Sequence, residues 1–357
     1  MTIKNNIDKR SDIIDSFIGT RNVYRMKMAI GRGDKFMIKK LFEWGFPNDY
    51  IDDNGDTLIL NAINSYKVSS LEELIDNGCD INQPNIYTND TPLLAACRKS
   101  NAVIFSILMD NGVDFKKRNN RNFNPCHYCA INNNVFALES LMFMGIEYDT
   151  PCVDGFTPVM YAGYFGNPII IEKLIERNVN LNVINSKNNY SLAMQSALGG
   201  RPDGLLKLLE HDIDVHSIGD DGHNVLSLCI ENLNYDDWEA CDLLIGNLLK
   251  RKVDVNIKYN IFIKNDKYEE KLILTPLIKS ILMLDGQLCK SLLENGADPN
   301  LSVFDDKTAI DFLFEKIDEY ELQFKDKILS LYSLLKKNGA VVKKEHVDRI
   351  NKMKEKK

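Results

Sequence analysis

Short apolar segments alternate with polar turns along the chain, in a pattern typical of paired helices. Each pair begins with a Thr, Ser or Asn, as in "NDTPLLAAC" and "GFTPVMYAG". This polar residue can cap a helix, and the Pro that often follows suits the first helical position. The second apolar segment ends in a pair such as Leu292-Leu293 and is followed by a Gly, which closes a helix C-terminus. The sequence therefore predicts two short helices in each unit.

The capping signature recurs at a nearly constant spacing. Successive capping positions lie 34, 33, 33, 34, 33, 51 and 33 residues apart. They are Thr57, Thr91, Asn124, Thr157, Ser191, Asn224, Thr275 and Thr308. A period of roughly 20 to 50 residues is typical of stacked repeat architectures. The one long interval indicates an insertion, at residues 258–273.

These units resemble the ankyrin repeat, whose consensus runs D-x-x-G-x-T-P-L-H-x-A-A, then a second helix and L-L-x-x-G-A-D-V-N. The resemblance covers residues 22–342 as about eight to nine divergent repeats. It implies an all-α solenoid of stacked helix-turn-helix units with hairpin-like finger loops. We expect residues 1–21 to form an N-terminal capping segment, 22–52 a degenerate first unit, and 343–357 a basic C-terminal tail that is a charged, frayed helix end.

Two insertions interrupt the repeat pattern. Residues 258–273 are expected to lengthen one finger, and a further insertion near 315–328 is expected to lengthen the last helices. Insertions of this kind map to loops and are often used for binding. A binding role and simple disordered decoration both stay open for residues 258–273.

Charge is distributed unevenly along the chain. The formal net charge is -7, yet residues 1–45 and 336–357 carry +5 and +6, which leaves about -18 on the residues between them. An acidic body repels phosphates, which argues against nucleic acid and favours a protein partner with a basic surface. No apolar run reaches the roughly 20 residues of a membrane helix, and no signal core follows the N-terminus, so we expect a soluble cytoplasmic protein.

The segment "NPCHYCA", residues 124–130, is the strongest candidate for chemistry because it brings Cys126, His127 and Cys129 together. A zinc site usually needs a second such pair, and the chain has no second C-x-x-C and no H-x-x-x-H. The ankyrin resemblance places both cysteines at packed positions and makes His127 the structural histidine of the family. We predict core packing, with no catalytic residue, cofactor or metal. A Cys/His-dependent metal or redox enzyme is the alternative.

The ankyrin resemblance leaves two sets of positions free for binding. The first is the finger residue just before each capping position. The second consists of the residues seven and eight positions after the capping position, which face the concave groove. Aromatic residues occupy three consecutive fingers, and exposed aromatic clusters bordered by arginine are typical of protein hot spots. The predicted partner-binding residues are Phe123, Phe156, Tyr190, Tyr164, Phe165, Tyr128, Arg98, Lys99 and Arg121. The alternative is that some of these rings turn inward and seal a divergent repeat interface.

Stacked repeats present a long surface without a closed pocket, so we expect a non-enzymatic protein that binds a partner protein through its groove and fingers. The 38 asparagines and the lysine-rich basic set favour an AT-rich genome, as in large DNA viruses, phages and intracellular pathogens. An effector that inhibits or sequesters a host defence or signalling protein fits this composition. An adaptor that recruits a partner to a larger complex, such as a ubiquitin ligase, is the alternative. Nothing in the sequence indicates an oligomeric state.

Overall fold

The computed structural model describes residues 19–232, 238–265, 268–320 and 324–355. Within them the chain divides into two compact units. The first unit runs to Ala162 and includes Asn167–Asn180, and the second comprises Gly163–Gly166 and the chain from Leu181 onwards. Residues 1–18 of the predicted capping segment lie outside the described residues.

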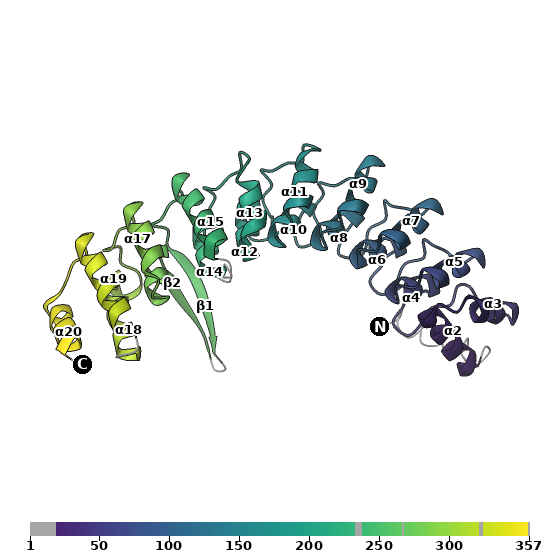
Figure 1. Cartoon of the computed structure of the whole chain (residues 1–357), viewed down its shortest axis with the longest axis horizontal. Coiled ribbons are helices and arrows are strands. Elements are labelled where there is room, and N and C mark those ends of the chain that lie inside the picture. Colours follow the sequence, from purple (N-terminus) through teal and green to yellow (C-terminus); the bar gives the residue numbers. More distant parts are fainter. Residues whose placement is uncertain (1–18, 233–237, 266–267, 321–323, 356–357) are drawn as a thin grey trace. The chain divides into compact units, whose positions relative to one another are not determined.

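The first unit consists of paired helices. Its elements are α2 (Thr20–Arg32), α3 (Lys35–Glu43), α4 (Leu58–Asn64), α5 (Val68–Asp76), α6 (Pro92–Lys99), α7 (Ala102–Asp110), α8 (Pro125–Ile131), α9 (Val135–Phe143), the first turns of α10 (Pro158–Tyr164), and α11 (Pro168–Ile175). The first helices α2, α4, α6 and α8 pack in one row, and the second helices α3, α5, α7, α9 and α11 pack in another (Figure 1). The predicted helix pairs are therefore confirmed, and α2 with α3 forms the degenerate first unit.

The predicted helix starts are also confirmed. Oγ1 of Thr91 accepts a hydrogen bond from the backbone N–H of Leu94 at 3.3 Å, and Pro92 lies in the first turn. The capping side chain makes the same bond at Thr57, Asn124, Ser191, Asn224 and Thr275. Each cap satisfies an N–H group that the helix leaves free, and so fixes the residue at which the first helix begins.

The core of the first unit lies between the two rows of helices. Helix α6 packs against α4 and α8 on its flanks and against α7 behind, so Leu93, Leu94, Ala95, Ala96 and Cys97 are all fully buried. The small side chains among them let neighbouring helices approach closely. In α6 this packing leaves the C-terminal end accessible, at Arg98 and Lys99.

The loops that precede the first helices are the fingers, which follow a shared backbone pattern. The finger at 85–90 is closed by a hydrogen bond from the Asn85 N–H to the Asp90 carbonyl at 2.9 Å, and the fingers at 52–56, 119–123 and 152–156 close in the same way. One backbone bond also joins each finger to the one before it, as from the Asn120 N–H to the Thr88 carbonyl at 3.0 Å. The fingers of the first unit therefore form a hydrogen-bonded series.

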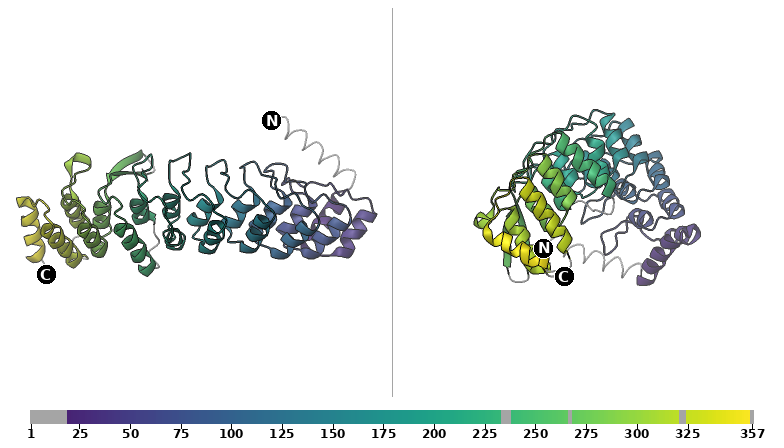
Figure 2. Two further views of the ribbon diagram at one scale, coloured as in Figure 1. Left: turned by 90° about the horizontal axis from the view of Figure 1, so that it is seen from above. Right: turned by 60° about the vertical axis from the view of Figure 1, so that its left-hand side comes forward.

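The second unit continues the same plan with one addition. Its elements are the last turn of α10, then α12 (Leu192–Leu198), α13 (Pro202–Leu208), α14 (Val225–Asn232), α15 (Trp238–Lys250), β1 (Tyr259–Asn265), β2 (Tyr268–Leu274), α16 (Pro276–Leu282), α17 (Gly286–Glu294), the 3-10 turn η1 (Phe304–Asp306), α18 (Ala309–Tyr320), α19 (Lys325–Lys337) and α20 (Lys344–Glu355). Strands β1 and β2 pair antiparallel, from Tyr259 opposite Leu274 to Asn265 opposite Tyr268. They lie on the same side of this unit as its fingers (Figure 2, left).

Both predicted insertions have the expected effect. The strands β1 and β2 lengthen one finger, which adds a two-stranded sheet to an otherwise helical chain. Helices α18 and α19 have 12 and 13 residues, against 7 to 9 in α16 and α17.

The basic C-terminal segment, which was expected to be a charged and frayed helix end, forms a helix that packs onto the unit in the described residues. Residues 344–355 form the helix α20, in which His346, Ile350 and Met353 are buried. The His346 ring stacks on Phe314 of α18 at 4.5 Å, and its Nε2 lies 3.3 Å from the Asp311 carboxylate. The many lysines of this segment made an apolar stripe at helical spacing difficult to recognise in the sequence. The stripe consists of His346, Ile350 and Met353, and it packs α20 onto the unit.

Candidate protein-interaction surface

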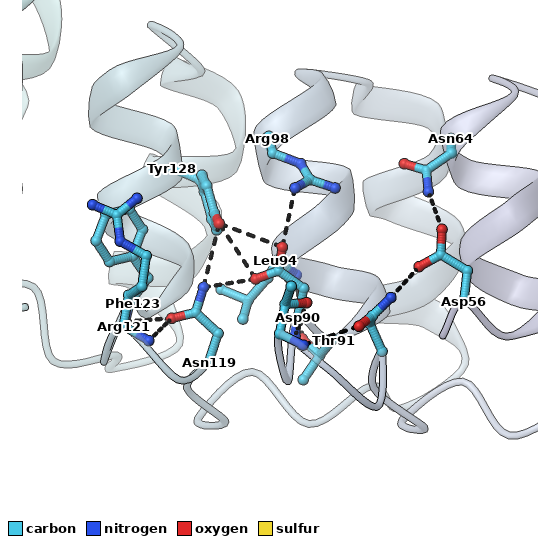
Figure 3. A network of polar contacts seen from close by, with 12 residues as sticks. Asp56, Asn64, Asp90, Thr91, Leu94, Arg98, Asn119, Arg121, Phe123 and Tyr128 are labelled. Carbon is cyan, nitrogen blue, oxygen red and sulfur yellow. Dashed lines mark hydrogen bonds and ion pairs between the residues drawn. The ribbon is translucent and has the colours of Figure 1, made fainter. Parts of the chain in front are cut away.

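The most ordered polar surface of the first unit lies where the fingers meet the ends of the first helices. We call it the finger face; it comprises the fingers at 52–56, 85–90 and 119–123 with the C-terminal ends of α4, α6 and α8 (Figure 3). The last finger residue pairs with the side chain eight positions later in two successive repeats. Asp56 accepts from the Asn64 amide at 3.1 Å, and Asp90 accepts from Arg98 at 3.0 Å. These pairs hold each finger against its own first helix.

The Asp90 carboxylate is the centre of this network and is almost fully buried. It accepts from the Asn119 amide at 2.6 Å and from the Tyr128 hydroxyl at 3.3 Å, both in the next repeat. Burial, and then the Asp90 charge, raise the pKa of Tyr128 to about 12, so this hydroxyl stays a donor. Oδ1 of Asn119 accepts from the backbone N–H groups of Arg121 and Phe123. Asp90 thereby fixes the conformation of the neighbouring finger.

Tyr66 is the most exposed aromatic residue of the finger face, and the sequence analysis missed it. It directly follows the C-cap of α4, its backbone has a φ of 56°, and 53% of the residue is exposed. The equivalent residues are Ser100 and Asn133, which also have positive φ. The left-handed backbone belongs to the repeat turn, and Leu284 adopts it at the same position in the second unit, but a bulky side chain is uncommon in this region. Nζ of Lys99 lies 5.2 Å from the Tyr66 ring centroid, within cation–π range.

The exposed aromatic patch predicted in the fingers is wrong for two of its residues. Phe123 is only 1% exposed, stacks on His127 at 5.0 Å and meets Tyr161 edge-on at 5.5 Å. The Arg121 guanidinium covers the ring at 4.7 Å while it pairs with Asp154 at 2.7 Å. The Phe123 ring therefore seals the interface between two repeats, as the alternative interpretation expected.

Tyr190 is the second buried member of that set. Its hydroxyl donates to the Asp221 carboxylate, and its ring lies over Gly219, where a Cβ atom would come within 2.3 Å of Cε1. The absent side chain at Gly219 makes room for the ring inside the second unit. Phe156, by contrast, remains half-buried, with its ring stacked on Tyr161 at 4.8 Å in the first unit.

The remaining predicted residues stay partly accessible. Tyr164 and Phe165 belong to the second unit, are half-buried and meet edge-on at 5.2 Å. In the first unit Arg98 and Arg121 are exposed, and Lys99 and Tyr128 are half-buried. The structure thus brings Arg98, Lys99 and Tyr128 together with Tyr66 on the finger face. Partner binding by these side chains stays a prediction.

The repeat geometry described above agrees with a comparison against known families. The family model for ankyrin repeats, which represents three copies, matches residues 26–119, 58–152, 105–188 and 126–219. Together these matches span more than half of the chain. The chain belongs to the ankyrin-repeat family. Ankyrin-repeat domains generally mediate protein–protein interaction, and this is the general role of the chain.

The ankyrin-repeat chain has curated relatives that are mostly longer than itself. It is similar to the ankyrin repeat protein nuc-2 of Neurospora crassa, with 22% identity over 278 residues, which is 70% of this chain and 26% of that protein. It is also similar to the ankyrin repeat protein FPV031 of fowlpox virus, with 30% identity over 131 residues, 36% of this chain and 38% of the viral protein. The chain therefore spans well under two thirds of the length of each.

Among solved structures, the crystal structure of the human ASB11 ankyrin repeat domain matches 62% of this chain and 96% of that chain, with a TM-score of 0.52 and 17% identity. A likeness at this identity shows the fold.

The Cys/His segment of this ankyrin-repeat chain lies inside the core. Cys126, His127 and Cys129 are fully buried, so the predicted packed position of both cysteines is confirmed, and Cys97 and Cys229 are fully buried as well. Nδ1 of His127 accepts from the Asn124 N–H at 3.2 Å, which completes a capping box, and burial lowers the pKa of His127 to about 4. Burial also raises the pKa of the Cys126 and Cys129 thiols. Across the described parts of the chain, no group of three or more His, Cys, Asp or Glu side chains could hold a metal ion.

Charge separates between the two rows of helices in the first unit. Helices α4, α6 and α8 carry no acidic residue and two basic ones, Arg98 and Lys99. The second helices α5, α7, α9 and α11 carry six acidic residues and one lysine, whereas α3 carries three lysines and one glutamate. Helices α5, α7, α9 and α11 therefore hold part of the acidic excess that predicted a basic partner, and α4, α6 and α8 hold none of it. No helix that the structure describes is long and apolar enough to cross a membrane.

Proposed function

We propose that this chain is a non-catalytic binding protein that captures a partner protein through the finger face of its first unit. The observation that carries the proposal is Tyr66, which holds an exposed aromatic ring in a left-handed backbone conformation. A soluble surface gains nothing in stability from an exposed ring at that position. An exposed tyrosine flanked by cations is, however, the usual anchor of a protein interface.

The network around Asp90 supports this role because it makes the surface rigid before a partner arrives. Asp90 fixes the finger at 119–123 through Asn119 and holds Tyr128 and Arg98 beside it. A preformed surface loses less conformational entropy on binding than a mobile one. The cations Arg98 and Lys99 then favour carboxylate or carbonyl groups on the part of the partner that meets this face.

The cellular setting of the proposal follows from composition and from one relative. The AT-rich residue usage and the similarity to the fowlpox virus protein favour a viral or pathogen effector that acts in the host cytoplasm. We infer that the chain inhibits or sequesters a host defence or signalling protein, because this role requires a single binding surface. An adaptor that recruits a partner to a larger complex needs a second surface and is the alternative.

The experiment compares capture by the full chain with capture by two matched variants. Tyr66→Asn with Lys99→Glu removes the ring and reverses the adjacent charge. Asn tolerates the left-handed conformation, as Asn133 does in the equivalent position, so the fold is preserved. The control is Phe36→Ser, which removes another exposed ring far from the fingers, on α3.

Host proteins that bind the immobilised chain are identified by mass spectrometry, and circular dichroism verifies the fold of each variant. We expect the Tyr66 variant to lose a protein that the Phe36 control retains. Equal capture of the same proteins by both variants would show that the finger face is not the binding surface.

A further inference from the structure

The second helices of the first unit carry a row of exposed apolar residues at one repeat position. The second residue of these helices is Phe36 in α3, Val103 in α7, Phe136 in α9 and Ile169 in α11, with exposed fractions between 49% and 69%. In α5 this position is Ser69, so three consecutive helices, α7, α9 and α11, form an unbroken apolar row. Most other exposed positions of these helices are polar or charged.

A second apolar feature lies at the opposite end of α9. Phe143, the last residue of this helix, is 86% exposed, and Met144 follows it. At the equivalent position the other repeats of the first unit have acids, namely Glu43, Asp76, Asp110 and Glu176. Phe136 and Phe143 are seven residues apart and therefore lie on the same side of α9. We call Val103, Phe136, Ile169, Phe143 and Met144 the outer apolar face.

The outer apolar face is exposed although one of its rings also contributes to repeat packing, since Phe136 meets the buried Phe105 of α7 edge-on at 5.9 Å. Helices α7, α9 and α11 pack side by side through other residues, such as Leu108, Leu138, Leu141 and Leu174, which are fully buried (Figure 1). Replacing an acid by Phe at position 143 lowers solubility without adding core. Large exposed apolar clusters with polar borders mark interaction sites.

We propose that the outer apolar face binds an amphipathic, positively charged helix of a partner protein. This inference goes beyond the proposed function, because the face lies on the second helices and shares no residue with the finger face. Its occupant is chosen by charge, since acidic residues surround the rings. Asp110 and Glu176 lie on either side of Phe143 in the repeat register, and Glu139 lies between the two Phe residues of α9. Lys173 of α11 pairs with Glu139 at 3.0 Å and with Glu176 at 3.3 Å, so these three acids and one lysine leave a net negative charge beside the rings.

The dimensions of the face match a single helix. Neighbouring helices lie about 8–10 Å apart, so the row from α7 to α11 is about 16–20 Å long, which is the length of about 11–13 helical residues. The seven residues from Phe136 to Phe143 span about 10 Å along α9, close to the 10–12 Å diameter of a helix with its side chains. A partner helix that crosses α7, α9 and α11 would pack its apolar side chains against Val103, Phe136 and Ile169. Lysines or arginines of that partner helix would then lie beside Asp110 and Glu176.

The same charges disfavour the other occupants of an apolar surface. A second copy of the chain would bring its own acidic residues against Asp110 and Glu176, and like charges brought together oppose association. An anionic membrane would be repelled for the same reason. A basic helix is the occupant that satisfies both the apolar and the acidic parts of the face.

The test uses a fluorescent model peptide of about 18 residues with leucines on one helical face and lysines elsewhere. Its binding to the full chain is followed by fluorescence anisotropy. A peptide of the same composition, shuffled so that the leucines no longer share a face, is the ligand control. We expect the amphipathic peptide to bind and the shuffled one to bind at least about tenfold more weakly, with both weakened by salt.

Two protein variants locate the site. Phe136→Ser with Phe143→Ser should weaken peptide binding by about tenfold or more, because large buried side chains dominate interface affinity. Phe36→Ser is the matched control, since it occupies the same repeat position on α3 outside the row and should leave binding unchanged. Tyr66→Asn should also leave it unchanged, so failure of this inference is separate from failure of the proposed function.

Three results would overturn the inference. Equal binding of the shuffled peptide, or equal loss in the Phe36→Ser control, would mean that the peptide binds through charge alone or elsewhere. Self-association of the unmodified chain in sedimentation, abolished by Phe136→Ser with Phe143→Ser, would assign the face to a second copy.

Discussion

The Asp90 network permits a stability prediction that can be worked from its contacts. Asp90→Ala removes the acceptor of Asn119, Tyr128 and Arg98 at once. The Asn119 amide is buried and its bond is short, at 2.6 Å, so it loses a charge-assisted hydrogen bond and keeps an unsatisfied donor. The Tyr128 bond is longer, and the Arg98 side chain is 41% exposed and can turn to water.

These differences set the magnitude. A hydrogen bond to a charged acceptor contributes about 1.5–3 kcal/mol, which applies to Asn119. The Tyr128 contact contributes about 0.5–1 kcal/mol because of its length. The exposed ion pair with Arg98 contributes about 0–1 kcal/mol. We therefore expect Asp90→Ala to lower the free energy of unfolding by about 2–5 kcal/mol, most of it through Asn119.

Urea unfolding followed by circular dichroism measures this change, and Asp56→Ala is the matched control. Asp56 occupies the same repeat position and accepts from Asn85 at 2.7 Å and from Asn64. The Asn85 amide also donates to the Asn54 carbonyl at 3.0 Å and keeps this partner, so the loss at Asp56 is expected to be smaller. Hydrogen exchange gives a local reading, because the finger at 119–123 should lose protection while that at 52–56 keeps it. A loss below about 1 kcal/mol, or unchanged exchange at 119–123, would refute the argument that Asp90 holds the neighbouring finger.

Three further predictions follow from burial and packing. The pKa of His127 is about 4 in the folded chain and about 6.5 in the unfolded chain. Between these pH values the unfolded chain binds a proton that the folded chain does not bind. The contribution of His127 to the free energy of unfolding is therefore fully present above pH 6.5 and falls by up to about 3 kcal/mol towards pH 4. His127→Gln should flatten this part of the pH profile in urea unfolding, and an unchanged slope would contradict the assignment. Gly219→Ala should destabilise by about 1–3 kcal/mol because its Cβ would collide with Tyr190, whereas Gly246→Ala, which has open space in α15, should be neutral or slightly stabilising in thermal unfolding. All eight thiols, including Cys126, are buried, so a thiol reagent should label the native chain slowly and all eight sites in urea; rapid labelling of the native chain would disprove their burial.

The repeat plan was predictable because it depends on local rules. A Thr or Asn cap, a following Pro and a closing Gly each act within a few residues, and the 33-residue spacing repeats them until chance is excluded. Helix starts at Thr57 and Thr91 and the long finger at 258–273 were therefore found from the sequence. The fold needed no knowledge of contacts between distant residues.

Side-chain exposure was less predictable because it depends on the neighbouring repeat. Phe123 and Tyr190 occupy finger positions that are open in a regular repeat, yet a Tyr at 161 and a Gly at 219 let their rings turn inward. Tyr66 escaped attention because it lies one residue beyond the groove positions that the family defines. A signal was present, since Gly166, Gly200, Ser100 and Asn133 occupy the same repeat position and a tyrosine there is larger than any of them.

Asparagine usage connects the composition of the chain with its fold. An AT-rich genome accounts for many asparagines, yet several of them make bonds that join one repeat to the next. Asn256 donates to the Gly296 carbonyl at 3.0 Å and accepts from the Asp298 N–H at 2.8 Å, and Asn300 repeats both bonds one unit later. Asn and Asp are also the residues that tolerate turns best. A biased composition and the turns of the repeat thus favour the same residue. The asparagine count therefore says little about the source of the chain. The viral proposal rests more on the similarity to the fowlpox protein.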